Sequence, residues 1–296
     1  MPTVQDNIAA PLVSVVIPCY NHGAFLCKAI ESVQRQTYRN IEILVIDDGS
    51  TDSTKAVATG YKGVRYLYQH NRGLSAARNT GIRNSTGAYI LFLDADDWLY
   101  PQGIAHQVAY LEQHRLHAFV SGGFDEVFVD ENRVQEVVQE VNENHYHRLL
   151  QGNYIGMVAT VLFRRKALEE VLFDEGLKNC EDYDVFLKIA RKHPVGHQTH
   201  KIAAYRYHNS NMSGNIPAML QGVLHVLDNH RKELSAAEEE RCSRDGRNVF
   251  INYYCRELYH KLRHKKTPIN RQARQMLLKY KPTLYFKFLL TQLLLK

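Results

Sequence analysis

Three carboxylates within four positions, Asp94, Asp96 and Asp97, are the residues of this sequence best suited to chemistry. Carboxylates this close repel one another, and each resists ionisation while its neighbours are charged. A divalent cation would offset the repulsion, because Mg²⁺ and Mn²⁺ prefer oxygen ligands and are often shared with substrate phosphates. The alternative is an exposed acidic turn in which Asp97 caps a helix beginning at Pro101. The apolar run Tyr89–Leu93 favours the cation, because it carries the carboxylates to the end of a buried strand.

A second pair of carboxylates, Asp47 and Asp48, ends another apolar run and is followed by Gly49, which allows a tight turn. A carboxylate there can accept a hydrogen bond from a ribose hydroxyl or from a base N–H. The alternative is that Asp48, Ser50 and Asp52 cap the helix that follows. The chain contains no G-x-G-x-x-G sequence and no P-loop, which argues against a dinucleotide site and a Walker-type site.

Two more candidates lie further along the chain. Asp182 begins a predicted helix and shares a helical face with Val185 and Phe186, so we expect it to point inward as a candidate general base. The alternative is a first-turn carboxylate favoured by the helix dipole. Arg206 and His208 alternate on a predicted strand and face the same side, where a cation and an imidazole suit a phosphate or a metal. The alternative for this pair is a solvated strand face.

The scaffold that must position these residues alternates predicted strands with predicted helices. Strands with continuous apolar character, separated by helices, indicate a parallel sheet covered on both faces. In such sheets ligands bind at the carboxyl ends of the strands, and the polar groups that follow the strands here converge on that edge. The predicted strands are Val13–Pro18, Ile41–Asp47, Val64–Gln69 and Ala88–Asp94.

The later part of the chain differs in pattern and in charge. The stretch Phe124–Val141 predicts a hairpin or a strand with an excursion, whereas residues 217–296 predict helices. Residues 217–296 carry 16 Lys/Arg and 7 Asp/Glu, and the rest of the chain carries 21 and 24, so the net charge of +6 comes from this second part. We therefore expect two domains, 1–215 and a basic helical region 216–296.

The composition excludes several classes of protein. Hydrophobic residues make up 45% of the chain and charged residues 23%, which is ordinary for a globular protein. No apolar run reaches about 18 residues, so we expect no membrane-spanning helix. The first residues lack the pattern of a signal peptide. The five cysteines are scattered and form no C-x-x-C pair, which argues against a zinc site or disulfide framework and favours a reducing, cytoplasmic compartment.

Four stretches taken together resemble a known family. They are "VSVVIPCYNHGAFLCKAIESVQRQTYRNIEILVIDDGSTDST", "NRGLSAARNTGI", "GAYILFLDADDW" and "EDYDVFLKIA", in that order. The set resembles the inverting glycosyltransferases of family 2 over about residues 12–210. The resemblance implies a GT-A fold, which is an α/β, Rossmann-like fold with a mainly parallel central sheet flanked by helices. Here it would carry a helical C-terminal extension.

The resemblance also implies roles for single residues on the donor side. It assigns one group of positions to the base and ribose of a nucleoside-diphosphate sugar, with a UDP-sugar as the leading candidate, and one arginine to the neighbourhood of the nucleotide. The positions matched are Pro18, Tyr20, Asn21, Asp47 and Asp48 for the base and ribose, and Arg78 near the nucleotide.

The resemblance also assigns residues to the metal site and to the catalytic general base. Asp94 and Asp96 match the D-x-D that holds the ribose and a Mn²⁺ or Mg²⁺ ion on the diphosphate, and Asp97 is a further candidate ligand in the same run. His208 matches a histidine that reaches the metal or the diphosphate. Asp182 matches the catalytic base, which would remove a proton from an acceptor hydroxyl while that hydroxyl attacks the anomeric carbon from the opposite side.

These matches predict a metal-dependent inverting transfer of a sugar to a saccharide or a lipid-linked glycan, in polysaccharide biosynthesis. A nucleotidyltransferase is the second interpretation, although it normally has a glycine-rich, basic loop that "IPCYNHG" lacks. A non-catalytic protein that binds sugar nucleotides is the third. The basic tail has no recognisable nucleic-acid-binding module, so we do not expect nucleic acid as a partner.

The apolar stretch Leu284–Leu295 predicts a short helix with lysines around it, Lys281, Lys287 and Lys296. A helix of this length is too short to cross a bilayer, but it can lie in the interface with its lysines directed at anionic headgroups. This predicts a peripheral protein at the inner face of the membrane. The alternative is packing against the other C-terminal helices or against a second copy of the chain.

Overall fold

The computed structural model describes residues 10–208, 211–232, 234–235, 242, 244–264 and 269–294. They divide into two compact units, and both units are discontinuous along the chain. The first takes the described residues up to Glu143, with Ile155–Gly176 and Lys188–His208. The second takes Asn144–Tyr154, Leu177–Leu187 and the described residues from 211 onward.

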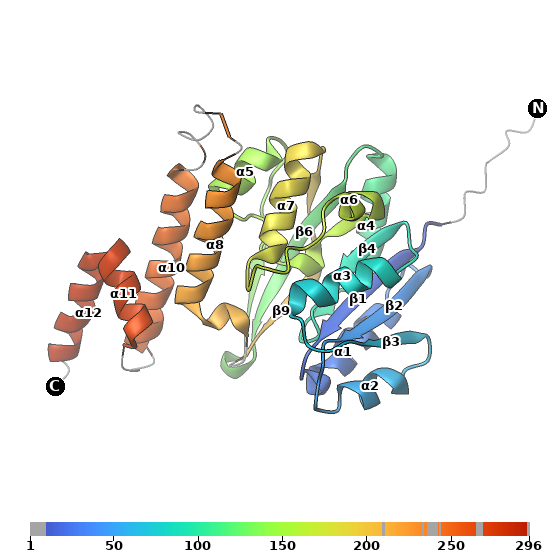
Figure 1. The fold of residues 1–296 in the computed structure, drawn as a ribbon, viewed down its shortest axis with the longest axis horizontal. Helices are drawn as coiled ribbons and strands as arrows, with labels where there is room; N and C mark the ends of the chain where they lie inside the picture. The colour runs from blue at the N-terminus through green and yellow to red at the C-terminus, as the bar shows by residue number, and fades with distance from the viewer. Residues whose placement is uncertain are drawn as a thin grey trace, which may run out of the picture. The chain divides into compact units, whose positions relative to one another are not determined.

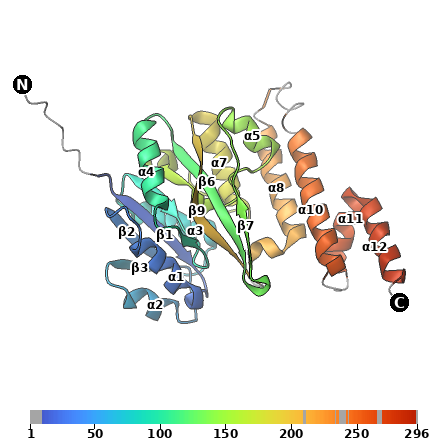
Figure 2. The same cartoon turned by 180° about the vertical axis from the view of Figure 1, so that it is seen from behind.

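The first unit is built on one mixed β-sheet with strand order β3-β2-β1-β4-β8-β6-β9-β5, and β7 pairs with β6 (Figures 1 and 2). The strands are β1 (Val13–Cys19), β2 (Ile41–Asp47), β3 (Val64–Tyr68), β4 (Tyr89–Phe92), β5 (Trp98–Leu99), β6 (Phe119–Phe128), β7 (Arg133–Val137), β8 (Leu162–Arg164) and β9 (Gly196–Tyr207). The half β3-β2-β1-β4 is parallel, as the alternating pattern predicts. The other half combines the parallel pair β6–β9 with antiparallel pairs, so the sheet is mixed rather than mainly parallel.

Helices cover both faces of this sheet. Helix α3 lies over the face seen in Figure 1, and α1 and α4 lie over the face seen in Figure 2. The helices of this unit are α1 (Gly23–Gln34), α2 (Thr54–Gly60), α3 (Leu74–Asn84), α4 (Gly103–Gln113) and α6 (Arg165–Glu170), together with the second half of α7 (Glu181–Lys192). Covering both faces explains why the strands are apolar at nearly every position instead of alternating.

Strand register brings the polar loops to one edge. Cys19 at the end of β1 pairs with Asp47 at the end of β2, so the loops that follow both strands begin side by side. Strand β4 ends earlier, at Phe92 opposite Val16. The chain continues along β1, because Leu93 N donates to Val16 O at 3.0 Å, and so delivers the acidic turn to the same edge.

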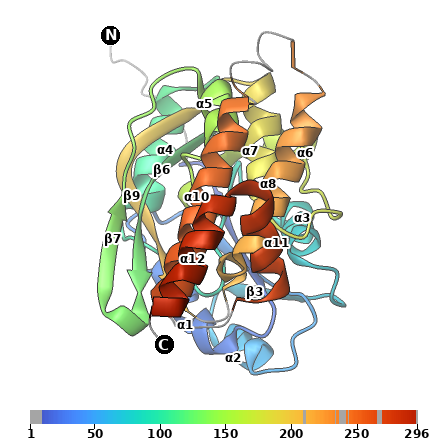
Figure 3. The same ribbon diagram turned by 90° about the vertical axis from the view of Figure 1, so that its left-hand side faces the viewer.

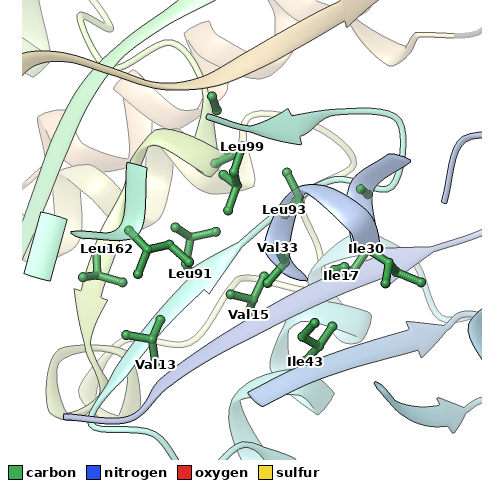
Figure 4. Close-up of a cluster of buried hydrophobic side chains, with 14 of the residues drawn as sticks. Val13, Val15, Ile17, Ile30, Val33, Ile43, Leu91, Leu93, Leu99 and Leu162 are labelled. Carbon is green, nitrogen blue, oxygen red and sulfur yellow. The ribbon is translucent and has the colours of Figure 1, made fainter. Parts of the chain in front are cut away.

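A cluster of buried apolar side chains lies beneath this edge. Val13, Val15 and Ile17 of β1 are 0% exposed. Figure 4 shows them packed with side chains of the neighbouring strands and with Ile30 and Val33 of α1. Burying a side chain of this size contributes about 1.5–3 kcal/mol, so the strands that carry the polar loops are firmly held.

The second unit is helical. It consists of α5 (His145–Gln151), the first half of α7, α8 (Ile216–Arg231), α10 (Arg244–His264), α11 (Arg271–Tyr280) and α12 (Pro282–Leu294). Asn215 caps α8 and Asn270 caps α11, each accepting a hydrogen bond from a first-turn amide. Within the described residues, no helix is long and apolar enough to cross a membrane. Leu295 and Lys296, at the end of the predicted apolar stretch, lie outside the described residues.

The structure overturns one local alternative and confirms one local expectation. The residues after Asp97 form the short strand β5, and the next helix begins at Gly103, so Asp97 does not cap a helix at Pro101. The stretch expected as a hairpin or an interrupted strand is a hairpin, because β6 and β7 pair antiparallel. All five cysteines lie among the described residues, and none of them forms a disulfide bond.

Candidate active site

The acidic turn and the end of β9 meet at the carboxyl edge of the sheet. His208 Nε2 lies 2.9 Å from Asp96 Oδ2, although 112 positions separate the two residues. His22, which precedes α1, places its Nδ1 3.9 Å from the same oxygen. The Asp96 side chain is only 11% exposed. A partly buried carboxylate between two imidazoles is suited to bind a cation or to orient a histidine.

Asp94 has a different partner. Its Oδ1 accepts a hydrogen bond from Arg78 Nη2 at 2.8 Å, and the Arg78 side chain is 2% exposed whereas that of Asp94 is 31% exposed. The buried guanidinium comes from α3 and lies over the ring of Phe173. A rigid, buried cation fixes the direction of this carboxylate and leaves it open to the surface.

Asp97 is the buried member of the run. It is 1% exposed, and its Oδ1 accepts a hydrogen bond from the backbone N–H of Arg206 at 2.8 Å. Burial raises the pKa of Asp97 well above its usual range, and the charges of Asp96 and Asp94 raise it further. This side chain ties β9 to the acidic turn, whereas Asp94 and Asp96 present carboxylates toward the edge.

The carboxylates after β2 organise two loops. Asp47 Oδ1 accepts from Ser50 N at 2.8 Å and its Oδ2 from the Tyr66 hydroxyl at 2.7 Å. Asp48 accepts from the backbone N–H groups of Arg72 at 2.9 Å and Gly73 at 2.8 Å. Both are buried, at 1% and 3% exposure. Asp48 therefore fixes the loop before α3, and does not cap the helix after it.

The loop after β1 holds the other predicted nucleotide contacts. Pro18 is buried within β1, and Tyr20 is 51% exposed. Asn21 has a φ of 54°, a left-handed conformation that asparagine tolerates better than most residues. Its Oδ1 accepts from Thr51 N at 2.8 Å, and its N–H donates to Ser50 Oγ at 2.9 Å. Asn21 thereby locks the first loop onto the loop that carries Asp48.

The donor set fits a divalent cation that is shared with a substrate. Among the described residues, no three His, Cys, Asp or Glu side chains are arranged to hold a metal by themselves. Mg²⁺ commonly uses one or two carboxylates and completes its shell with water and substrate phosphates. Asp96 and His208 supply an oxygen and a nitrogen at one point, with the half-open Asp94 two residues away in the turn.

Comparison with known proteins identifies the family. The model of the family described as "Glycosyl transferase family 2" matches residues 14–172, which is more than half of the chain. The chain belongs to glycosyl transferase family 2. It is 34% identical over 202 residues to an uncharacterized glycosyltransferase of Rickettsia prowazekii, covering 64% of this chain and 61% of that protein. It is 31% identical over 247 residues to one of Rickettsia typhi, covering 79% and 76%.

Similarity to solved structures identifies the fold of this family 2 chain. The crystal structure of S. aureus TarS in complex with UDP-GlcNAc is 18% identical, with a TM-score of 0.69 over 91% of this chain and 80% of that one. The mannosyltransferase PcManGT of Pyrobaculum calidifontis, in complex with GDP-Man and Mn²⁺, is 16% identical, with a TM-score of 0.61 over 95% and 83%. The fold is GT-A, as the sequence resemblance implies. The chain spans only 33% of a longer Rickettsia bellii relative.

Asp182 of this family 2 chain lies in the second unit. It is half-buried, and its Oδ1 accepts a hydrogen bond from Tyr183 N at 2.7 Å. Its neighbours Glu181 and Asp184 are buried more deeply, at 5% and 3% exposure. Asp184 has a buried partner, because His230 Nε2 of α8 lies 3.0 Å from its Oδ1. The expectation of an inward-facing Asp182 thus describes Asp184 better.

Sequence reasoning missed Phe25, Lys28 and Trp98, which lie beside Arg206 and His208 near the acidic turn. His208 stacks on Phe25 with ring centroids 4.7 Å apart, and the guanidinium carbon of Arg206 lies 5.0 Å from the same ring. This contact confirms that Arg206 and His208 face one side. Lys28 Nζ lies 3.1 Å above the Trp98 ring, and Arg206 lies 5.1 Å from it. Phe25 and Lys28 are three positions apart on α1 and so share a helical face, but the sequence does not show that this face lies beside the acidic turn.

A cavity of the first unit lies away from these residues. It has a volume of about 540 Å³ and lies beside the start of β9, between α4 and the chain that follows β7. None of the predicted site residues lines it. Its lining includes the stacked rings of His106 and His200, whose centroids are 3.9 Å apart.

Proposed function

We propose that this chain transfers a sugar from a nucleoside-diphosphate sugar to a hydroxyl group of a saccharide or a lipid-linked acceptor, with inversion at the anomeric carbon. The observation that carries the proposal is the meeting of Asp96 and His208 at the carboxyl edge of a family 2 fold. The neighbouring Arg78–Asp94 pair and the buried Asp48 support it, because they give the same edge further groups that suit a nucleotide.

On the donor side, Asp48 and Asp47 are proposed to meet the base, and Pro18, Tyr20 and Asn21 to line the base and ribose. The exposed ring of Tyr20 offers a stacking surface, and aromatic stacking on a base is worth about 1–3 kcal/mol. A UDP-sugar is the leading candidate donor. The proposal draws on the TarS complex with UDP-GlcNAc and the PcManGT complex with GDP-Man.

Asp96 and His208 are proposed to hold a Mn²⁺ or Mg²⁺ ion, with Asp94 and Asp97 as further carboxylates of the same turn. When bound, such an ion neutralises charge on a leaving diphosphate. The chain's own part is to orient these groups. Arg78 fixes Asp94, and the Arg206 N–H fixes Asp97, so little reorganisation is needed on binding.

Asp182 is proposed as the general base. Its carboxylate accepts the proton of the acceptor hydroxyl as the acceptor oxygen forms a bond to the anomeric carbon, and the bond from that carbon to the diphosphate oxygen breaks. Assistance of this kind contributes about 10²–10⁴-fold in rate. The nucleotidyltransferase alternative is disfavoured by the family match, and the non-catalytic alternative by the presence of all the carboxylates that the mechanism needs.

The experiment is a measurement of UDP binding by calorimetry with Mn²⁺ or with EDTA, followed by hydrolysis of a panel of nucleotide sugars. We expect binding to weaken in EDTA, and Asp96→Ala to weaken binding with Mn²⁺ far more than binding in EDTA. A matched control is Asp130→Ala, which removes a carboxylate from the β6–β7 turn. Equal affinity with and without the metal, together with full turnover in excess EDTA, would contradict the metal assignment.

A further inference from the structure

Among the side chains that the structure describes, helix α12 buries one apolar face and exposes another. Tyr285 and Phe288 are 7% and 3% exposed and belong to the core of the second unit. Phe286, Leu289 and Leu290 are 57%, 36% and 61% exposed. These three lie at positions i, i+3 and i+4, so they form one stripe on the helix surface. Figure 3 looks onto α12 and α11, which lie side by side.

The surroundings of this stripe are basic. Residues 269–294 contain five Lys/Arg and no Asp or Glu. Arg271, Arg274, Lys279 and Lys287 are exposed, and Lys281 is half-buried. Leu278 of α11 adds another exposed apolar side chain, at 38%. An apolar stripe flanked by Lys and Arg side chains complements a surface with an apolar interior and an anionic outer layer.

We propose that the exposed face of α11 and α12 binds in the plane of an anionic membrane surface. Phe286, Leu289 and Leu290 enter the boundary between headgroups and acyl chains, and the exposed cations contact lipid phosphates. Helix α12 has 13 residues and is about 20 Å long, less than the hydrocarbon core of about 30 Å, so it lies in the interface. This binding does not depend on the proposed sugar transfer.

Charge argues against a second copy of the chain as the occupant. A two-fold interface brings the same patch of both copies together, so the cations around the stripe would face those of the partner with no carboxylate in the segment to pair with them. A bilayer surface with anionic lipid supplies the missing charge. Each Lys or Arg close to such a surface raises partitioning about fivefold, and salt weakens the effect.

The test is co-sedimentation of the full chain with two kinds of vesicle. One kind contains phosphatidylcholine alone, and the other also contains about 30% phosphatidylglycerol, which mimics an anionic leaflet. We expect binding to the anionic vesicles only, and weaker binding at high salt. The double variant Lys279→Gln, Lys287→Gln should lower partitioning about 25-fold. The double variant Phe286→Ser, Leu290→Ser should lower it at least about tenfold, because the stripe then has little apolar area to bury.

The matched control is Leu116→Ser with Val134→Ser, which removes two exposed apolar side chains, at 84% and 62%, from the first unit. It should bind vesicles like the parent. All substituted residues are exposed, and thermal unfolding will verify that the variants fold. If the variant Phe286→Ser, Leu290→Ser is unstable, the variant Lys279→Gln, Lys287→Gln still tests the proposal. Three results would overturn the proposal. The parent chain could stay in the supernatant, or the variants could bind vesicles like the parent. The third is a parent chain that is dimeric in solution and becomes monomeric in the double variant Phe286→Ser, Leu290→Ser.

Discussion

Two carboxylates of α7 that are two positions apart have different surroundings. Asp182 is half-buried, whereas Asp184 is buried against His230 in the second unit. Asp182→Asn keeps the size of the side chain but cannot take a proton at neutral pH. We expect kcat to fall by about 10²–10⁴-fold with little change in donor affinity or in thermal unfolding. Steady-state kinetics with a saturating donor is the measurement.

The companion variant Asp184→Asn should behave in the opposite way. It weakens a buried hydrogen-bonded pair, which costs about 1–3 kcal/mol of the free energy of unfolding. The variant should unfold at lower urea concentration, and the protein that remains folded should keep its kcat. A near-normal kcat for Asp182→Asn, with loss of activity in stably folded Asp184→Asn, would reverse the assignment.

The sequence predicted the carboxylates of the site but not their immediate partners. Asp48 and Asp96 stand out because each follows an apolar strand, and this pattern is local. The contact of Asp96 with His22 and the position of Lys28 over Trp98 depend on how α1 packs beside β5 and β9. Such packing leaves no repeating signature in one sequence. These contacts form only when segments far apart in the sequence pack together in the fold.

At the scale of elements, Glu42 joins three parts of the sheet. Its Oε1 accepts hydrogen bonds from Ser14 Oγ at 2.6 Å, from Thr86 Oγ1 at 2.9 Å and from Gly87 N at 3.2 Å. Burial acts to raise the pKa of Glu42, but hydrogen bonds from Ser14, Thr86 and Gly87 outweigh it and hold the pKa below its usual value of 4.5. The ionised side chain therefore connects β2 to β1 and to the turn before β4.

This connection predicts a stability effect that depends on pH. Glu42→Gln replaces charged acceptors by a neutral one, so the free energy of unfolding at pH 7 should fall by about 1–2 kcal/mol. A lowered pKa stabilises the fold above pH 4.5, and that contribution is lost as the pH falls through the folded-state pKa. The difference between parent and variant in urea unfolding should shrink below about pH 4.5. If parent and variant differ in the free energy of unfolding by the same amount from pH 7 to pH 4, ionised Glu42 does not stabilise the fold in this way.

Long periodic elements were predictable and short ones were not. The four parallel strands and the helices α1 and α3 follow from apolar runs and 3.6-residue spacing. Strand β5 has two residues and β8 has three, too few for any period to show. Both exist because a neighbouring strand pairs with them, β9 with β5 and β4 with β8. This pairing also makes the second half of the sheet mixed.

At the scale of the whole molecule, a boundary near residue 215 was expected from composition and stays a prediction. Within the second unit, however, the Tyr183 hydroxyl donates to Leu149 O at 2.5 Å, and the Tyr183 ring packs edge-on against Phe250 of α10 at 5.7 Å. A chain ending at Asn215 would lose that partner. We expect it to be poorly folded, because several buried side chains worth about 1.5–3 kcal/mol each become exposed.

Thermal unfolding and size-exclusion chromatography of residues 1–215 beside the full chain are the measurements. We expect aggregation or a lower transition temperature for the shorter chain. A shorter chain that is monomeric and unfolds cooperatively at the temperature of the full chain would show that residues 144–154 and 177–187 need no helices from beyond Asn215.

The interleaving of the two units also has a consequence during synthesis. Gly246 of α10 is so close to α5 that a Cβ there would meet the Leu150 carbonyl oxygen at 1.9 Å, so α5 docks on a residue made almost a hundred positions later. Translation at about 5–20 residues per second needs roughly 5–20 seconds to cover such an interval. During that time α5, which carries the buried residues Leu149 and Leu150, lacks its packing partner α10. We therefore expect chaperones to bind the nascent chain. The rate of translation determines how long the apolar surface of α5 stays exposed to solvent.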